Sequence, residues 1–247
     1  MRYDIKADGL DDALEPLKQL SGPAARRALQ MALNKMAEEA IGPLQSEVAS
    51  VFDRPTPFTV NAFRIDYAKQ SSLEAAVAVK DEKSGSSKGQ APEAWFEPQV
   101  YGGERQLKAS EKWLRQAGIL PAGMYIAPGR GARLDAYGNM SRGHIQQVLS
   151  GLKAFDLSGS DHNATDSARS LAKGHGRAFF VVRKGNRPIG IAERRGKSMQ
   201  MVLLFIREPS YSRRFDFHKV VRHVAENDAL FESYIDEALA TALRRGW

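Results

Sequence analysis

An amphipathic pattern organises residues 22 to 51. Gly22-Pro23 suits the start of a helix, because proline's missing N–H costs nothing in the first turn. The apolar side chains that follow recur every three or four residues and form one stripe over roughly eight turns, at Leu29, Leu33, Met36, Ala40, Leu44, Val48 and Val51. Gly42-Pro43 interrupts the stripe. Since proline removes one backbone hydrogen bond, we expect a kink or break near Ile41.

A second long helical pattern closes the chain. Residues 215 to 245 show an apolar face with helical spacing, made by Phe231, Ile235, Ala238, Leu239 and Ala242. Asn227-Asp228 is expected to interrupt it. At the other end, residues 2 to 6 alternate like a short strand, and Asp8-Gly9-Leu10 is expected to open a helix.

Strand patterns occupy two regions of the chain. Residues 64–67 and 73–80 are separated by a short polar connection and predict a hairpin. Residues 178–183, 188–194 and 199–207 are separated by short basic turns and predict a β-meander. Between these regions, residues 108–117 and 142–154 are expected to be helical.

Helices and strands are segregated along the chain rather than alternating, which favours an α+β fold. We expect the long N-terminal and C-terminal helices to pack on an antiparallel sheet made of the hairpin and the meander. Residues 1–91 and 155–247 would form this core domain, with 92–154 as a helical insertion. The polar stretches 81–90 and 158–176 are expected to be exposed loops.

Basic charge is concentrated in the middle of the sequence. Residues 1–100 hold 12 basic and 15 acidic side chains, residues 101–215 hold 20 and 8, and residues 216–247 hold 4 and 6. A segment this basic attracts polyanions, and such binding depends strongly on salt. A solvated basic surface that only keeps loops soluble explains the same composition.

Several classes of site are disfavoured. The 247-residue chain contains no cysteine, which excludes disulfides, zinc-thiolate sites and cysteine nucleophiles. The longest apolar run, Met201 to Ile206, is too short to cross a bilayer, so we expect a protein made in the cytoplasm that does not contact membranes. The five histidines lack metal-ligand spacing and are assigned to surface or helix-cap positions. We expect no catalytic residue, metal or cofactor.

Two glycine-rich loops carry arginine but lack the Gly-Lys-Ser/Thr ending of a nucleotide-binding loop. Gly129-Arg130-Gly131-Ala132-Arg133 and Gly174-His175-Gly176-Arg177 instead suggest flexible tips whose arginines meet phosphates without reading sequence. Together with the basic meander turns they give the candidate contacts for DNA or an acidic partner, which are Arg130, Arg133, Arg177, Lys184, Arg187, Arg194, Arg195 and Lys197.

Parts of the sequence resemble tail-completion proteins of tailed bacteriophages and are similar in outline to the minor tail protein Z family of lambdoid phages. The likeness lies in the short helix from Gly9-Leu10, the alanine-rich helix with Ala28, Asn34, Ala37 and Ala40, and the closing run from Ala238 to Arg245. The segments Arg54–Thr59 and Asn61–Arg64 resemble prophage proteins. The likeness covers about half the chain, and residues 92–154 depart from the family pattern.

The resemblance implies a structural virion protein of the tail or neck. Such a protein would form part of a ring, commonly six-fold, at the head-to-tail junction. Its partners would be copies of itself, the neighbouring connector, tail terminator or tail tube proteins, and DNA passing through the lumen. Two other classes remain open: a sequence-independent DNA-binding protein, and a hydrolase or nuclease that would depend on Asp161, His162 and Asp166.

Overall fold

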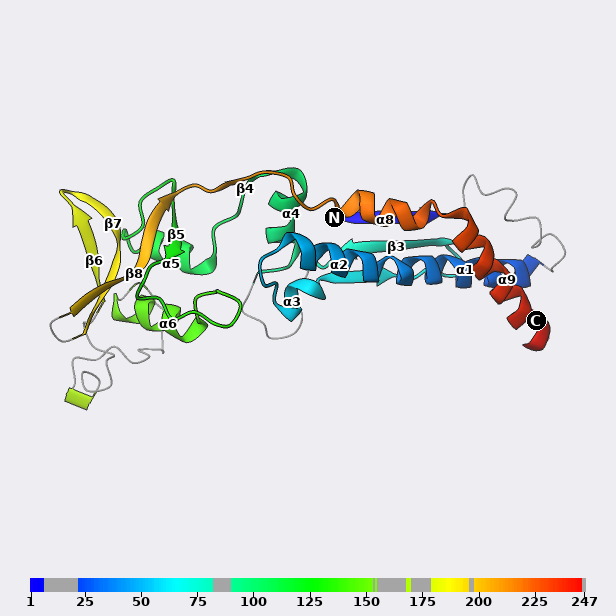
Figure 1. Cartoon of the computed structure of the whole chain (residues 1–247), viewed down its shortest axis with the longest axis horizontal. Coiled ribbons are helices and arrows are strands. Elements are labelled where there is room, and N and C mark those ends of the chain that lie inside the picture. The colour runs from blue at the N-terminus through cyan, green and yellow to red at the C-terminus, as the bar shows by residue number, and fades with distance from the viewer. Residues whose placement is uncertain are drawn as a thin grey trace. The chain divides into compact units, whose positions relative to one another are not determined.

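The chain forms two compact units in the computed structural model (Figure 1). Unit 1 comprises Met1–Gly102 and Ser212–Trp247, and unit 2 comprises Gly103–Tyr211. The structure describes residues 1–6, 22–81, 90–152, 154, 168–169, 179–195 and 198–245. No helix in this described part is long and apolar enough to span a membrane.

The two long apolar stripes of the sequence form helices in unit 1, which contains further short helices. The described helices of unit 1 are α1 (Gly22–Glu39), α2 (Ile41–Val51), α3 (Pro57–Val60), α4 (Glu93–Tyr101), α8 (Phe217–Ala225) and α9 (Asp228–Arg245). The break expected at Gly42-Pro43 is confirmed, since α1 ends before Ala40 and α2 begins after it. The interruption at Asn227-Asp228 is also confirmed: Asn227 caps α9 by accepting the Leu230 N–H at 3.1 Å.

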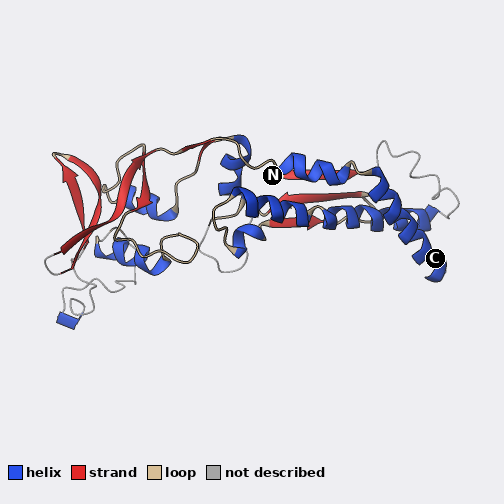
Figure 2. Cartoon of the chain, viewed as in Figure 1, coloured by secondary structure: helices blue, strands red, loops and turns tan. Residues whose placement is uncertain are grey.

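A three-stranded antiparallel sheet completes unit 1 (Figure 2). It contains β1 (Arg2–Lys6), β2 (Phe63–Asp66) and β3 (Glu74–Val79) in the order β1-β3-β2. The predicted hairpin is therefore confirmed as β2–β3. The N-terminal strand joins the far side of β3, with Tyr3 opposite Val77.

The core of unit 1 lies between this sheet and the helices. Leu33 and Met36 of α1 and Leu44 of α2 are fully buried, as the stripe requires. Rings from distant segments meet there: Phe96 of α4 lies 5.2 Å from Phe215 and 5.7 Å from Phe63, centroid to centroid. These contacts fix the chain just before unit 2 begins and just after it ends.

Unit 2 is built on a four-stranded antiparallel sheet of order β5-β8-β7-β6. The strands are β5 (Met124–Pro128), β6 (Phe179–Lys184), β7 (Arg187–Arg195) and β8 (Ser198–Arg207). A two-stranded ladder joins β4 (Gly103–Glu104) to β9 (Ser210–Tyr211) where the chain enters and leaves the unit.

Two helices, α5 (Ala109–Gln116) and α6 (Arg142–Gly151), supply the rest of the unit 2 core. Leu114 of α5 and Val148 of α6 pack in one apolar cluster with Ile191, Leu203 and Phe205 of the sheet. The predicted meander and both predicted helices are therefore confirmed.

The α+β class is confirmed, but two details of the predicted arrangement change. The hairpin and the meander belong to different sheets rather than to one. The compact units meet at residues 102/103 and 211/212 rather than at 91/92 and 154/155, because β8 pairs with β5 of the predicted insertion and so draws the meander into unit 2. The helix expected at Asp8-Gly9-Leu10, loop residues 82–89 and nearly all of 158–176 lie outside the described residues.

Candidate nucleic-acid interface

Unit 2 carries the excess positive charge of the chain. Residues 103–211 hold 18 basic and 8 acidic side chains, a formal net charge of +10. The remaining residues, which make up unit 1, hold 18 basic and 21 acidic side chains, a net charge of −3. The imbalance seen along the sequence is thus a property of one folded unit.

The turn between β6 and β7 presents two of the predicted contact residues. Lys184 and Arg187 lie opposite each other at the ends of the strands and are exposed. Gly185 between them adopts a φ of 61°, a conformation that glycine reaches without strain. The hairpin therefore holds both cations at its tip, where a phosphate backbone can reach them.

Arg194 is exposed near the other end of β7. Its guanidinium lies 5.4 Å from the centroid of the Phe180 ring, which is cation–π distance. This contact orients the side chain over β6 while leaving its donors available to an anion. Arg195 follows on the same strand, but its side chain is outside the described residues, as are Arg177 and Lys197.

Close packing explains the glycines of the 129–133 loop. The Gly129 N–H donates to the Val202 carbonyl at 2.9 Å and the Gly131 N–H to Met201 at 2.8 Å. A Cβ on Gly129 would meet the Met201 carbonyl oxygen at 2.3 Å, and one on Gly131 would meet Gln200 at 2.9 Å. The expectation of a flexible tip is therefore wrong: the glycines allow the loop to lie against β8.

The two arginines of this loop differ in their surroundings. Arg133 is anchored to α6, since its backbone N–H donates to His144 Nδ1 at 3.0 Å and its guanidinium to Gln147. Arg130 is exposed, and no described residue pairs with its guanidinium. Arg130 is thus available to a ligand, and Arg133 is held in place beside it.

The histidine assignment needs a correction in two places. His144 is buried at 1% exposure, with Glu193 Oε2 at 3.9 Å from its Nε2, because it fastens the 129–133 loop to α6. His218 of unit 1 is half-buried and bonds the Tyr101 hydroxyl at 2.9 Å, and its burial lowers its pKa. Their isolated positions in the sequence gave no signal of either role.

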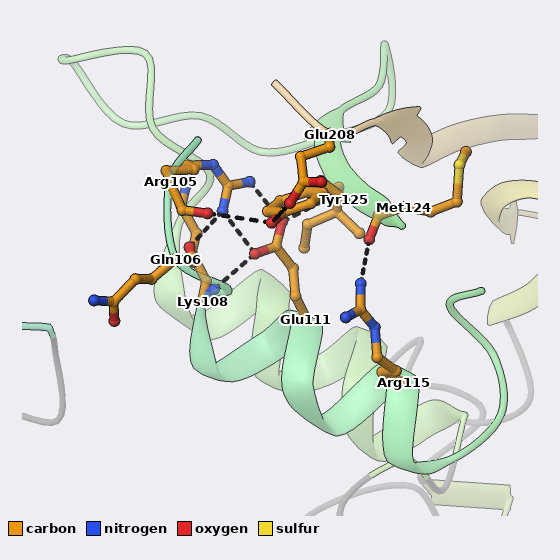
Figure 3. Close-up of polar contacts among 9 residues, drawn as sticks. Arg105, Gln106, Lys108, Glu111, Arg115, Met124, Tyr125 and Glu208 are labelled. Carbon is orange, nitrogen blue, oxygen red and sulfur yellow. Dashed lines mark hydrogen bonds and ion pairs between the residues drawn. The ribbon is translucent and has the colours of Figure 1, made fainter. Parts of the chain in front are cut away.

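A buried ion pair in unit 2 links α5 to the segment before it and to β5 (Figure 3). Glu111 of α5 is fully buried, and Arg105 donates to both of its carboxylate oxygens, at 2.7 and 2.6 Å. Glu111 also accepts the N–H of Lys108 at 2.7 Å, which caps α5, and that of Ile126 at 2.9 Å, which lies in β5. Burial raises the pKa of Glu111, but these hydrogen bonds outweigh it and hold the pKa below its ordinary value.

Tyr125 extends the same network towards the end of β8. Its hydroxyl donates to the Glu208 carboxylate and lies 3.2 Å from the Arg105 carbonyl oxygen, while the Arg105 guanidinium lies 4.7 Å from the ring centroid. The hydrogen bond to Glu208, with burial, raises the pKa of Tyr125 to about 12. The network joins α5, β5 and the segment before β9.

The carboxylate of Glu111, at the centre of this network, is occupied by hydrogen bonds within unit 2. Four donors bind it, two from Arg105 and two backbone N–H groups. No group of three or more His, Asp or Glu side chains suited to a metal occurs among the described residues. Asp161, His162 and Asp166 lie outside the described part of the chain.

Comparisons with known proteins found no matching family model, no matching curated protein and no matching solved structure.

Proposed function

We propose that this chain is a non-catalytic structural protein of a tailed-phage particle, a tail-completion or minor tail protein in a ring at the head-to-tail junction. The observation that carries the proposal is the separation of charge, with +10 on unit 2 and −3 on unit 1. A compact basic unit suits a protein that lies beside DNA, while a second unit is left for contacts with other subunits. The placement in a phage particle rests on the resemblance of the helical segments.

The interface suits contact with a phosphate backbone better than readout of bases. Lys184, Arg187 and Arg130 are exposed at a hairpin tip and a loop rather than along an element that could enter a groove. Charge–phosphate contacts of this kind position DNA without sequence preference. Such contacts would guide DNA through a lumen without stopping its passage.

The same charge favours a second candidate, a sequence-independent DNA-binding protein of phage or prophage origin. That protein would bind DNA as a free subunit and would be absent from mature particles. A structural ring protein would be present in particles at stoichiometric amounts.

The deciding experiment locates the chain in purified particles by electron cryomicroscopy, with the symmetry determined rather than imposed. Density for a ring at the neck or tail end supports the structural proposal. Absence from mature particles, together with DNA binding by the free chain, would favour the second candidate.

DNA binding itself is tested by a matched pair of double variants. Changing Lys184 and Arg187 to Gln should weaken binding of duplex DNA and reduce the slope of log K against log salt by about 0.9 for each phosphate that the protein no longer neutralises. The control changes Lys219 and Arg222, two exposed cations of unit 1, to Gln and should leave affinity and slope unchanged. Equal effects of the two double variants would show that net charge, not this interface, governs binding.

A further inference from the structure

The two outer strands of the unit 1 sheet have hydrogen-bonding edges that no described residue occupies. The Val79 N–H donates to the Met1 carbonyl and the Lys80 N–H to the Ala62 carbonyl, so odd-numbered residues of β3 bond to β1 and even-numbered ones to β2. By this alternation the backbone groups of Phe63 and Ile65 point away from the sheet at one edge. Those of Arg2, Asp4 and Lys6 point away at the other.

One of the two edges of the unit 2 sheet, at β5, is protected by side chains. On β5, the outward Ile126 N–H donates to Glu111 and the outward Met124 carbonyl accepts from Arg115 at 2.9 Å. Pro128, which has no N–H, occupies a further outward position of the same strand. The chain therefore blocks β5 with side chains and a proline, whereas no described residue protects the outer edge of β1 or β2 in this way.

The sequences of the two outer strands are complementary. Tyr3-Asp4-Ile5-Lys6 and Phe63-Arg64-Ile65-Asp66 share an aromatic–charged–Ile–charged order with the charge signs reversed. In both strands the aromatic residue and the isoleucine face the helices, where Ile5 and Phe63 are buried, and the charged residues lie on the other face. Both strands run antiparallel to β3 and hence parallel to each other.

We propose that β2 of one copy of this chain pairs in parallel with β1 of a second copy, continuing the sheet from subunit to subunit. In the register that places Phe63 beside Tyr3 and Ile65 beside Ile5, the charged neighbours are Arg64 with Asp4 and Asp66 with Lys6. This proposal rests on the proposed function, in which the chain forms a ring, and it identifies the two strand edges through which neighbouring subunits of that ring would bind.

The hydrogen-bond phase of the two edges fits this register. In a parallel ladder, the backbone N–H and C=O of each outward residue bond to the two residues that flank the residue directly opposite it on the neighbouring strand. Phe63 would bond to Arg2 and Asp4, and Ile65 to Asp4 and Lys6. These are the residues of β1 whose backbone groups point away from β3, so every outward group of Phe63 and Ile65 gains a partner.

Space beside β2 accommodates a neighbour. A hollow of about 260 Å³ lies between α2 and β2, lined by Ile41, Gln45, Phe63, Ile65 and Tyr67 among others. Tyr67, at the end of the strand, is 53% exposed. An added strand would cover apolar surface here as well as backbone. Because the two edges are different surfaces, repeated pairing is head-to-tail and closes into a ring when the rotation between copies permits.

The test uses two proline variants of the full chain, with mass measured by light scattering or native mass spectrometry. Ile65→Pro removes an outward N–H of β2, and Asp4→Pro removes one of β1, without deleting a bond to β3. Each variant alone should be monomeric, while the wild-type chain and the controls Ile65→Val and Asp4→Glu associate. An equimolar mixture of the proline variants should stop at the dimer, because each retains the one edge that the other has lost.

A cross-link gives a second readout that does not depend on proline. The chain has no cysteine, so Arg64→Cys and Asp4→Cys introduce single thiols. Within one chain β3 separates these positions by about 10 Å, beyond the reach of a disulfide of about 7 Å between Cα atoms, whereas in the proposed register they are adjacent. Oxidising a mixture of the two variants should give a covalent dimer joining one chain of each kind.

Assembly that survives both proline substitutions, a wild-type chain that is monomeric at every concentration, or no mixed disulfide would each overturn the interface. The proposed location in the phage particle is tested independently of this interface. A ring in particles whose proline variants still assemble overturns the edge pairing alone. Association through these edges in a chain absent from particles supports the pairing and overturns the proposed location.

Discussion

Replacing Glu111 with Gln tests whether the buried ion pair holds unit 2 together. The substitution keeps the side-chain shape and one acceptor oxygen, so the Ile126 or Lys108 N–H can remain satisfied. It removes the negative charge and turns an amide N–H₂ towards the donors that now face a carboxylate. Arg105, whose side chain is 12% exposed, would then remain largely buried without its partner.

The expected cost is about 3 kcal/mol. Breaking a buried ion pair by removing one partner costs about 3–5 kcal/mol, because an uncompensated charge is left in the interior. Glu111 is fully buried and Arg105 contacts both of its oxygens, so this range applies. The lower end is expected because the amide retains some of the hydrogen bonds.

Hydrogen exchange measured peptide by peptide separates unit 2 from unit 1. In the Gln variant, peptides from α5 and β5 should lose about 3 kcal/mol of opening free energy while those of α1 are unchanged. The control Glu104→Gln, at an exposed carboxylate of β4, should change it by less than about 0.5 kcal/mol. A loss in the Glu111 variant no larger than in the control would refute the argument that this pair holds α5 to β5.

Three further outcomes follow from the same contacts. Because the pKa of Glu111 is depressed, its ionised carboxylate stabilises the folded state above the ordinary carboxyl pKa, and this stabilisation is lost as pH falls through the folded-state pKa. Acid titration should therefore destabilise wild-type unit 2 more than the Gln variant. Because the pKa of Tyr125 is raised to about 12, its protonated hydroxyl stabilises the folded state below pH about 10, and this stabilisation is lost as pH rises towards 12. The Tyr125→Phe variant should lack this pH dependence in alkaline denaturation curves. Gly129→Ala should destabilise unit 2 by about 1–3 kcal/mol in thermal melts, whereas Gly143→Ala, in α6 with open space around it, should be neutral or stabilise by up to about 1 kcal/mol.

Local sequence patterns predicted most elements of the fold. The α1 and α9 stripes, the break at Gly42-Pro43, the β2–β3 hairpin and the meander all depend on residues that are near one another in the chain. Helix periodicity, proline geometry and turn composition act over a few residues, so they can be read without knowledge of the fold. Local patterns did not predict α4, which contains Pro98, or β5, which is short and ends in Pro128. Nor did they predict the short elements α3, β4 and β9.

The candidate interface was predicted in its charge and only partly in its geometry. Sequence alone identified Lys184, Arg187 and Arg194, because these cations flank strands or turns that local pattern also predicts. It misread the glycines at 129 and 131, whose role depends on a contact with β8, far along the chain, between Gly129 and Val202.

The sequence by itself determined the helical stripes, their breaks, the strand content and the concentration of basic residues, all properties of neighbouring residues. Tertiary structure decided that β8 pairs with β5, so that the meander joins the predicted insertion and a +10 charge gathers in one unit. It also decided that Glu111 and His144 are buried, and that β1 and β2, separated by 56 residues between Lys6 and Phe63, flank the same strand. Such pairings depend on which distant surfaces exclude water together, and no local periodicity encodes that choice.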